Sequence, residues 1–266
     1  MPSILKRYRA FLIDIDGVLV RGSQPIARSA EALTQLQQAA HTVLLSNNST
    51  RSRADLAEYL QSIGFSVSPD NALVSGSIAA AYLFKLDGPT TVWCIGETGL
   101  RKELESAGHR LAQTPADAAW VVAGLHRSIT YDDLTDALHA FQAGARFLAT
   151  NDDASFPTER GLIPGAGAII GALAGMGYAP SVVVGKPSPI AFDVALSHLG
   201  LPAGDVLMIG DRLDTDIVGG CNAGLETALL LSGVTTRSVL DSSDASPTWI
   251  ADDLHALVRG QAMRNA

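Results

Sequence analysis

A short apolar run near the start of the chain, Phe11–Leu19, constrains the fold most strongly, because two carboxylates one residue apart, Asp14 and Asp16, interrupt it. The run predicts a buried strand, and side chains at i and i+2 of a strand project to the same face. Gly17 follows directly and allows the chain to turn. Two acids at the end of a buried strand cost desolvation energy unless a cation or hydrogen bonds compensate. The stretch therefore indicates either a metal site or a strand end in water.

Three further apolar runs also end in polar residues. They are 42–45 before Ser46 and Asn47, 181–185 before Lys186, and 205–210 before Asp211, with Asp216 close behind. Stretches with apolar residues at helical spacing separate the runs. Strands that alternate with helices predict a parallel sheet, in which ligands bind beyond the carboxyl ends of the strands. We therefore expect an α/β fold with a Rossmann-like parallel-sheet core, and we expect the four strand endings to converge on one edge of it.

A turn signal at Gly88-Pro89 begins a second α/β module, with strands predicted at 91–95, 119–123 and 146–150. The Asp-, Pro- and Gly-rich segment 151–167 is predicted to be a linker that returns to the first module. We therefore predict a catalytic core of residues 1–86 and 179–266. Residues 87–178 are predicted to form an inserted α/β cap domain.

Composition and charge narrow the function. With 47% hydrophobic and 17% charged residues, the chain is globular rather than disordered. The net charge of −8 argues against a surface for a nucleic acid polymer, which usually needs clustered Lys and Arg. No window of 18 strongly apolar residues predicts a membrane span, and the basic start is followed by too short an apolar run for a signal peptide. We therefore expect a cytoplasmic protein.

The acids at the strand ends fit phosphoryl transfer through an aspartate nucleophile. Asp14 can attack phosphorus and also bind a metal, and Asp211 can complete an oxygen-rich Mg²⁺ site. Asp16 is placed to protonate the leaving oxygen and later to activate water. The acids therefore divide into a catalytic pair, Asp14 and Asp16, and a metal ligand, Asp211.

The other strand endings supply donors and positive charge for a phosphate group. Ser46 and the backbone of Asn47 can donate hydrogen bonds to its oxygens. Lys186 adds a compact point charge. We therefore expect these three residues to bind the substrate phosphate.

The motifs together resemble the haloacid dehalogenase superfamily of phosphatases. Asp14-Ile-Asp16-Gly17 is similar to its first motif, Ser46-Asn47-Asn48 to its second, Lys186-Pro187 to its third, and Gly210-Asp211 with Asp216 to its fourth. The resemblance implies that Asp14 is the nucleophile, Asp16 the acid and base, and Mg²⁺ the metal. It also implies that Asp16 binds the metal through its backbone carbonyl, and that Asp216 supports the metal through water or orients Lys186.

The spacing of the motifs resembles one branch of that superfamily. In this chain 140 residues separate Ser46 from Lys186, so the inserted module lies between the second and third motifs. This arrangement is similar to the 4-nitrophenylphosphatase-like branch, whose members carry a large C2-type α/β cap there. The resemblance implies Mg²⁺-dependent hydrolysis of small phosphate monoesters, such as 4-nitrophenyl phosphate, glycerol phosphate, phosphoglycolate, sugar phosphates or nucleotides, with the cap closing over the site.

Several alternatives stay open at this point. A dehalogenase or a phosphomutase can use the same fold, although a dehalogenase has no use for Asp16 or for a metal. A binding protein that has lost catalysis is a further alternative, but it should lack at least one of the core motif residues. An exposed apolar surface on the inserted module would favour a homodimer.

Two sites in the inserted module have no assigned role. His126 stands where members of the superfamily commonly carry an acid, which puts in doubt any substrate that depends on that acid. The segment Asn151–Asp153 either lines the entrance of the site or forms a simple turn.

Overall fold

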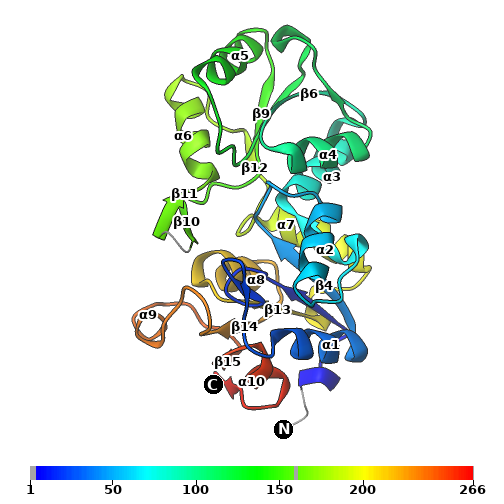
Figure 1. The fold of residues 1–266 in the computed structure, drawn as a ribbon, viewed down its shortest axis with the longest axis vertical. Coiled ribbons are helices and arrows are strands. Elements are labelled where there is room, and N and C mark those ends of the chain that lie inside the picture. The colour runs from blue at the N-terminus through cyan, green and yellow to red at the C-terminus, as the bar shows by residue number, and fades with distance from the viewer. Residues whose placement is uncertain (1–3, 159–160, 266) are drawn as a thin grey trace. The chain divides into compact units, whose positions relative to one another are not determined.

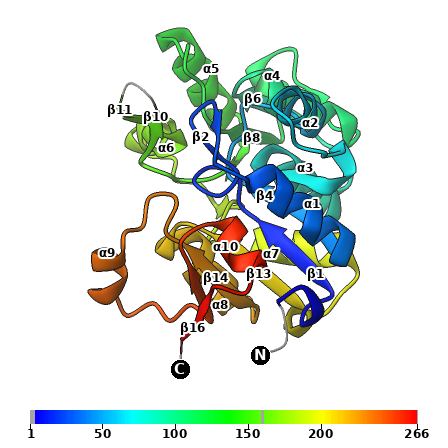
Figure 2. The same ribbon diagram turned by 60° about the horizontal axis from the view of Figure 1, so that its bottom comes forward.

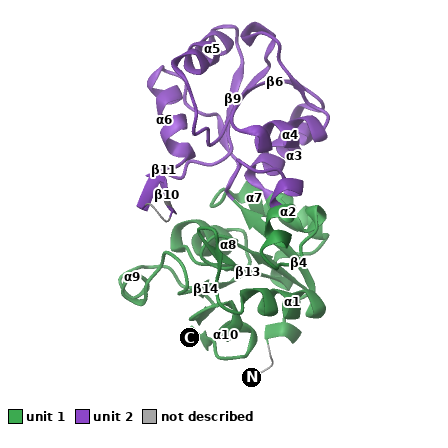
Figure 3. Ribbon diagram, in the orientation of Figure 1, with its two compact units in different colours: residues 1–46, 57–73, 186–266 green, residues 47–56, 74–185 purple. Residues whose placement is uncertain are grey.

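The structure, a computed structural model, describes residues 4–158 and 161–265. The chain forms two compact units (Figure 3). The first takes residues up to 46, 57–73 and the chain from 186 onward, and the second takes residues 47–56 and 74–185. Both units are α/β with parallel sheets, so the predicted fold class is confirmed. The second unit is larger than the predicted cap domain of residues 87–178, and its role as a cap stays a prediction.

The first unit is built on a seven-stranded sheet with the order β16-β15-β14-β13-β1-β4-β5. Pairing is parallel from β15 through to β4, and β16 is antiparallel to β15. The strands are β1 (Ala10–Ile13), β4 (His41–Ser46), β5 (Ala72–Val74), β13 (Val206–Gly210), β14 (Glu226–Leu230), β15 (Trp249–Ala251) and β16 (Met263–Arg264).

The two central strands, β1 and β13, are buried along their whole length. Ile13 pairs with Ile209, and the N–H of Asp14 still donates to the carbonyl of Ile209 at 2.8 Å, so the ladder carries Asp14 to the end of the sheet. From β1 the chain proceeds to β4 and β5 on one side, whereas from β13 it proceeds to β14 and β15 on the other. Such a reversal of strand order is where α/β sheets bind ligands. Asp14 and Asp211 follow the two strands that flank it.

Helices cover this sheet in two layers, which Figures 1 and 2 show from two directions. Helices α1 (Ser29–Ala39) and α10 (Leu254–Val258) contact each other in one layer. Helices α7 (Pro189–Leu199) and α8 (Val218–Asn222) contact each other in the second layer. The apolar side chains of α1 that face the core, among them Leu33 and Leu36, are fully buried, as the helical spacing in the sequence predicts.

The second unit contains a five-stranded, all-parallel sheet with the order β12-β9-β8-β6-β7. Its strands are β6 (Thr91–Ile95), β7 (Arg110–Leu111), β8 (Trp120–Ala123), β9 (Arg146–Ala149) and β12 (Val182–Val183). Helices α5 (Tyr131–Gln142) and α6 (Ala166–Gly175) contact each other and β8. Their apolar sides form a core with the sheet that includes Val121, Phe141 and Leu173. This core confirms that the second module has an apolar interior of its own.

The remaining elements complete the two units. They are α2 (Arg53–Ser62), α3 (Ser75–Asp87), α4 (Thr98–Ser106), α9 (Arg237–Asp241), β2 (Val20–Arg21), β3 (Gln24–Pro25), β10 (Ser155–Thr158) and β11 (Gly161–Pro164), with helical turns at Ile4–Lys6, Pro69–Asn71, Pro115–Asp117, Ala203–Asp205 and Leu213–Ile217. In the part of the chain that the structure describes, no helix is long and apolar enough to cross a membrane.

Two predictions about the chain between the units are wrong. The segment 151–167 is not a linker, because β10 and β11 form an antiparallel hairpin within it. The apolar run before Lys186 does not join the seven-stranded sheet, because β12 pairs with β9 in the second unit. A short apolar run is compatible with either sheet, and its composition does not identify the neighbouring strand. The chain therefore enters the first unit at Lys186, directly after the last residue of the second.

Candidate active site

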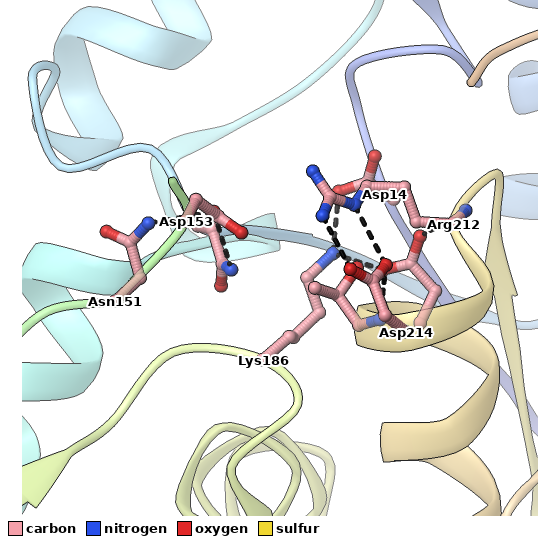
Figure 4. A network of polar contacts seen from close by, with 9 residues as sticks. Asp14, Asn151, Asp153, Lys186, Arg212 and Asp214 are labelled. Carbon is pink, nitrogen blue, oxygen red and sulfur yellow. Dashed lines mark hydrogen bonds and ion pairs between the residues drawn. The ribbon is translucent and has the colours of Figure 1, made fainter. Parts of the chain in front are cut away.

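Lys186 binds two carboxylates in the interior of the first unit (Figure 4). Its Nζ donates to Oδ1 of Asp14 at 2.6 Å and to Oδ1 of Asp216 at 2.7 Å. Only 2% of the lysine side chain is exposed. Burial alone would lower the pKa of Lys186, but the charges of Asp14 and Asp216 and their hydrogen bonds raise it above its ordinary value. Lys186 is therefore a fixed ammonium ion between two acids.

Asp216 is held in place by the chain around it. Its Oδ2 accepts a hydrogen bond from the N–H of Arg212 at 3.1 Å, and the residue is fully buried. A side chain at Gly210 would overlap the Asp216 side chain, so glycine at this position is what lets Asp216 pack against the end of β13. The guanidinium of Arg212 binds the exposed Asp214 at 2.7 Å, which keeps Asp214 at the surface (Figure 4).

Asp211 occupies a narrow space at the end of β13. Its Oδ2 accepts from the N–H of Val234 at 2.6 Å, and a Cβ at Gly17 or Gly233 would overlap its carboxylate. Gly17 also has a φ of 83°, a conformation that L residues rarely adopt. Burial and the charge of Asp216 raise the pKa of Asp211 to about 7, although the Val234 hydrogen bond opposes the shift. Glycine is therefore required on both sides of this carboxylate.

The three buried acids form a group that fits a metal ion. Carboxylate oxygens of Asp14, Asp211 and Asp216 all lie within 4.8 Å of one another. Burial raises the pKa of Asp14 well above its ordinary value, and the neighbouring acids add to this shift, although the charge of Lys186 opposes it. Oδ1 of Asp211 is buried and has no hydrogen-bond partner among the described residues. An unpaired buried carboxylate oxygen in a set of oxygen ligands suits a hard divalent cation.

The other predicted site residues lie near the strand ends but outside this group. The Asp16 side chain is exposed, in a turn closed by a hydrogen bond from the N–H of Gly17 to the carbonyl of Val20 at 2.7 Å. Ser46 is buried at the end of β4, next to β1. Asn47 belongs to the second unit, where its Nδ2 donates to Oδ2 of Asp153 at 3.1 Å.

Comparison with known proteins identifies the family to which the chain belongs. The profile of haloacid dehalogenase-like hydrolases matches residues 11–110, and a HAD-hydrolase-like profile matches residues 183–257. An acid sugar phosphatase of Staphylococcus haemolyticus is 35% identical over 257 residues, which are 96% of this chain and 97% of the relative. The chain belongs to the haloacid dehalogenase-like hydrolases. The resemblance inferred from the four motifs is thus confirmed.

Solved structures in the same family have the same fold. A p-nitrophenyl phosphatase from Archaeoglobus fulgidus has a TM-score of 0.89 and 40% identity, over 95% of this chain and 99% of that chain. A glycerol phosphate phosphatase from Mycobacterium tuberculosis, in complex with magnesium, has a TM-score of 0.89 and 34% identity, over 97% and 78%. The predicted similarity to 4-nitrophenylphosphatases is therefore confirmed, and the chain is a phosphoric monoester hydrolase.

In this family member, His126 lies in the second unit and lines a cleft there. The cleft has a volume of about 500 Å³ and is also lined by Gly96, Glu97, Thr98, Arg101, Arg127 and Ser128. Nε2 of His126 is 4.0 Å from Oδ2 of Asp133, and Arg127 forms an ion pair with Glu97 at 2.7 Å. The charge of Arg127 is thus partly neutralised within the unit.

Two contributors to the site carry no signal in the sequence. Val234 and Gly233 contact Asp211 through a backbone N–H and through the absence of a side chain. A backbone amide donates equally well from most residues, so no residue type marks the position. Gly233 would be found only by asking which glycines lie close to a buried acid.

Proposed function

We propose that this protein is a Mg²⁺-dependent phosphatase that hydrolyses small phosphate monoesters through an aspartyl-phosphate on Asp14. One observation carries the proposal. Asp14 is fixed by Lys186 inside a buried group of three acids, and this group includes Oδ1 of Asp211, which has no hydrogen-bond partner among the residues that the structure describes. A nucleophilic carboxylate needs positive charge nearby before it can approach a phosphate, and the lysine and a cation bound by the acids would supply it.

The metal would be held by the carboxylates of Asp14 and Asp211 and by the backbone carbonyl of Asp16. When bound, it supplies charge that screens the Asp14 carboxylate from the phosphate oxygens. The raised pKa values of Asp14 and Asp211 support this assignment, because both acids lose stability as anions without a compensating cation. Asp216 would support the site indirectly, because its carboxylate accepts hydrogen bonds from Lys186 and from the N–H of Arg212.

In the first half of the reaction, Asp14 forms a bond to phosphorus while the ester oxygen leaves. We assign the attack to Oδ2, because Oδ1 accepts the hydrogen bond from Lys186. Asp16 donates its proton to the leaving oxygen, so the alcohol departs neutral. Ser46 and the backbone N–H of Asn47 would donate to the phosphate oxygens.

In the second half, water attacks phosphorus and the bond to Asp14 breaks. Asp16, now a carboxylate, takes a proton from this water and is ready for the next cycle. Its exposure suits this role, because a group that exchanges protons with alcohol and water has to reach both.

The substrate class follows from the relatives. Those described above are named acid sugar phosphatase, p-nitrophenyl phosphatase and glycerol phosphate phosphatase. We propose that the present chain also takes small monoesters of this kind, with an aryl phosphate as a convenient assay substrate. A panel of phosphorylated sugars, glycerol phosphate, phosphoglycolate and nucleotides, assayed for Mg²⁺-dependent phosphate release, would rank them.

The test is Asp14→Asn, assayed with 4-nitrophenyl phosphate in Mg²⁺. Turnover should fall by about a thousandfold or more, because the amide cannot replace the nucleophile. Asp214→Asn is the matched control, since Asp214 is exposed and its described contacts are with the guanidinium of Arg212 and the backbone N–H of Thr215, not with Asp14, Lys186 or Asp211. Wild-type turnover by Asp14→Asn would refute the mechanism. Transfer of the phosphate to a second sugar instead of water would favour a phosphomutase.

A further inference from the structure

The loop after β4 belongs to the second unit, and its described side-chain contacts lie within that unit. Nδ2 of Asn47 donates to Oδ2 of Asp153 at 3.1 Å, and Nδ2 of Asn151 donates to the same oxygen at 2.8 Å (Figure 4). Hydrogen bonds to an ionised acceptor are stronger than those between neutral groups. A single carboxylate oxygen therefore gathers two amides, one of which belongs to the predicted phosphate-binding motif.

The backbone of Asn47 is held as well. Oγ of Ser75, at the start of α3, donates to the carbonyl of Asn47 at 2.6 Å, and Ser75 is fully buried. On the other side, a Cβ at Gly185 would lie 2.8 Å from Oδ1 of Asn47, so only glycine leaves room for the amide. Ser49 adds a third contact, because its Oγ accepts from the N–H of Leu125 at 3.2 Å.

The turn that carries Asp153 is fixed independently of its carboxylate. The carbonyl of Asp153 accepts from the N–H of Gly167 at 2.9 Å, and the carbonyl of Ala154 accepts from the N–H of Gly165 at 2.9 Å. Both glycines lie against this backbone so closely that a Cβ on either would overlap it. Removing the carboxylate of Asp153 should therefore leave the turn in place.

We propose that Asp153 is a positioning residue for phosphate binding. It holds the side chain of Asn47 and thereby fixes the direction of the Asn47 backbone N–H, which would donate to the phosphate. This inference rests on the proposed phosphatase function. It assigns to the Asn151–Asp153 segment a role in phosphate affinity that the sequence leaves open, and it makes the second unit responsible for one of the phosphate donors.

A double-mutant cycle between Asp153 and Asn47 tests the proposal. The variants Asp153→Ala, Asn47→Ala and the double variant are assayed with 4-nitrophenyl phosphate for kcat and KM, and with inorganic phosphate for its inhibition constant. Asp153→Ala should raise the inhibition constant for phosphate by about tenfold, which is the effect of losing one hydrogen bond to a charged group. In the Asn47→Ala background the same change should have an effect of less than about twofold, because the residue through which Asp153 acts is already gone.

Two conservative variants sharpen the result. Asp153→Asn keeps an oxygen acceptor without the charge, so it should raise the constant by only about threefold. Ser75→Ala should also raise it, because it frees the Asn47 carbonyl. Asp132→Ala is the matched control, since Asp132 is an exposed acid of the same unit at the start of α5, and it should leave phosphate inhibition unchanged.

Equal effects of Asp153→Ala with and without Asn47 would overturn the proposal, since Asp153 would then act by another route. Unchanged phosphate inhibition in Asp153→Ala would also overturn it, while a loss of turnover in Asp14→Asn would leave the proposed function standing. Retained turnover in Asp14→Asn would instead refute the proposed function. If Asp153→Ala does not fold, the cycle with Asp153→Asn decides in the same way.

Discussion

Replacing Asp211 by asparagine should stabilise the metal-free protein at pH 8 and abolish its stabilisation by Mg²⁺. Asp211 is buried, and its pKa is raised from 3.8 to about 7 by burial and by the charge of Asp216. Between these values the folded protein keeps a proton that the unfolded chain has released. The free energy of unfolding therefore falls as the pH rises from about 4 to about 7, by roughly 4 kcal/mol at most.

Asparagine removes this penalty because it has no charge to bury. Its Oδ1 can still accept from the N–H of Val234, but its NH₂ group takes the place of Oδ1 of Asp211, for which the described part of the chain offers no partner. An unpaired buried donor costs about 1–3 kcal/mol at every pH. The variant should therefore be less stable than the wild type near pH 4 and about 2 kcal/mol more stable at pH 8, where the wild-type penalty of roughly 4 kcal/mol is fully present.

Mg²⁺ should reverse the order at pH 8. A ligand at a hundred times its Kd stabilises the folded state by about 2.7 kcal/mol, and the variant lacks one of the proposed ligands. Urea denaturation in EDTA and in MgCl₂, at pH 4, 6 and 8, measures both effects, and the difference between the two proteins cancels the titration of other groups. A variant less stable than the wild type in EDTA at pH 8, or equal stabilisation of both proteins by Mg²⁺, would refute the reasoning.

Two further substitutions test the interiors of the two units. Lys186→Met should lower the free energy of unfolding of the metal-free protein at pH 7 by about 3–5 kcal/mol, because it leaves the carboxylates of Asp14 and Asp216 buried without their cation; a loss below about 1 kcal/mol in urea denaturation would contradict the buried ion pair. Phe141→Ala should cost about 3–5 kcal/mol, because Phe141 stacks on Tyr178 at 4.7 Å between ring centres inside the second core. Thermal denaturation that leaves the second unit unaffected would contradict that packing.

The central strands could be predicted from the sequence almost to the residue. The strand predicted at 91–95 is β6 (Thr91–Ile95), and the one predicted at 205–210 is β13 (Val206–Gly210). Short, mostly apolar runs of four to eight residues that are bounded by turn signals favour strands of a sheet covered on both faces. The proximity of Asp14 and Asp211 then follows, because neighbouring parallel strands end on the same edge.

Other elements depend on information that the local sequence does not hold. The helical spacing of Ile26, Leu33 and Leu36 predicts a helix from about Pro25, but α1 begins at Ser29, because residues 20–25 form the small hairpin of β2 and β3. The sequence does not predict hairpin β10–β11, because Pro157 lies within its first strand and proline argues against a strand. The sheet that β12 joins is decided by its tertiary contacts with β9, since its sequence is compatible with either sheet. In each case a contact with distant residues prevails over the local pattern.

The same limit applies to the first pair of acids. Alternation along a strand places Asp14 and Asp16 on one face, but β1 ends at Ile13 and the chain turns at Gly17. Asp14 is consequently buried and Asp16 exposed. A period of two holds only while the strand continues, so the sequence predicts the chemistry of this pair better than its geometry.

Two of the four points at which the chain passes between the units lie inside the motifs that are expected to bind phosphate. At the first of these points, Ser46 belongs to the first unit and Asn47 to the second. At the other, Gly185 belongs to the second unit and Lys186 to the first. A Cβ at Gly185 would lie only 2.6 Å from the carbonyl oxygen of Thr150, so Gly185 packs closely against the second unit. Its neighbour Lys186 binds Asp14 and Asp216 of the first unit. Neighbouring Cα atoms are only about 3.8 Å apart, so a displacement of Asn47 or Gly185 reaches Ser46 or Lys186 through a single peptide bond. Substitutions in the second unit that shift either crossing should therefore change phosphate affinity even where they touch no substrate.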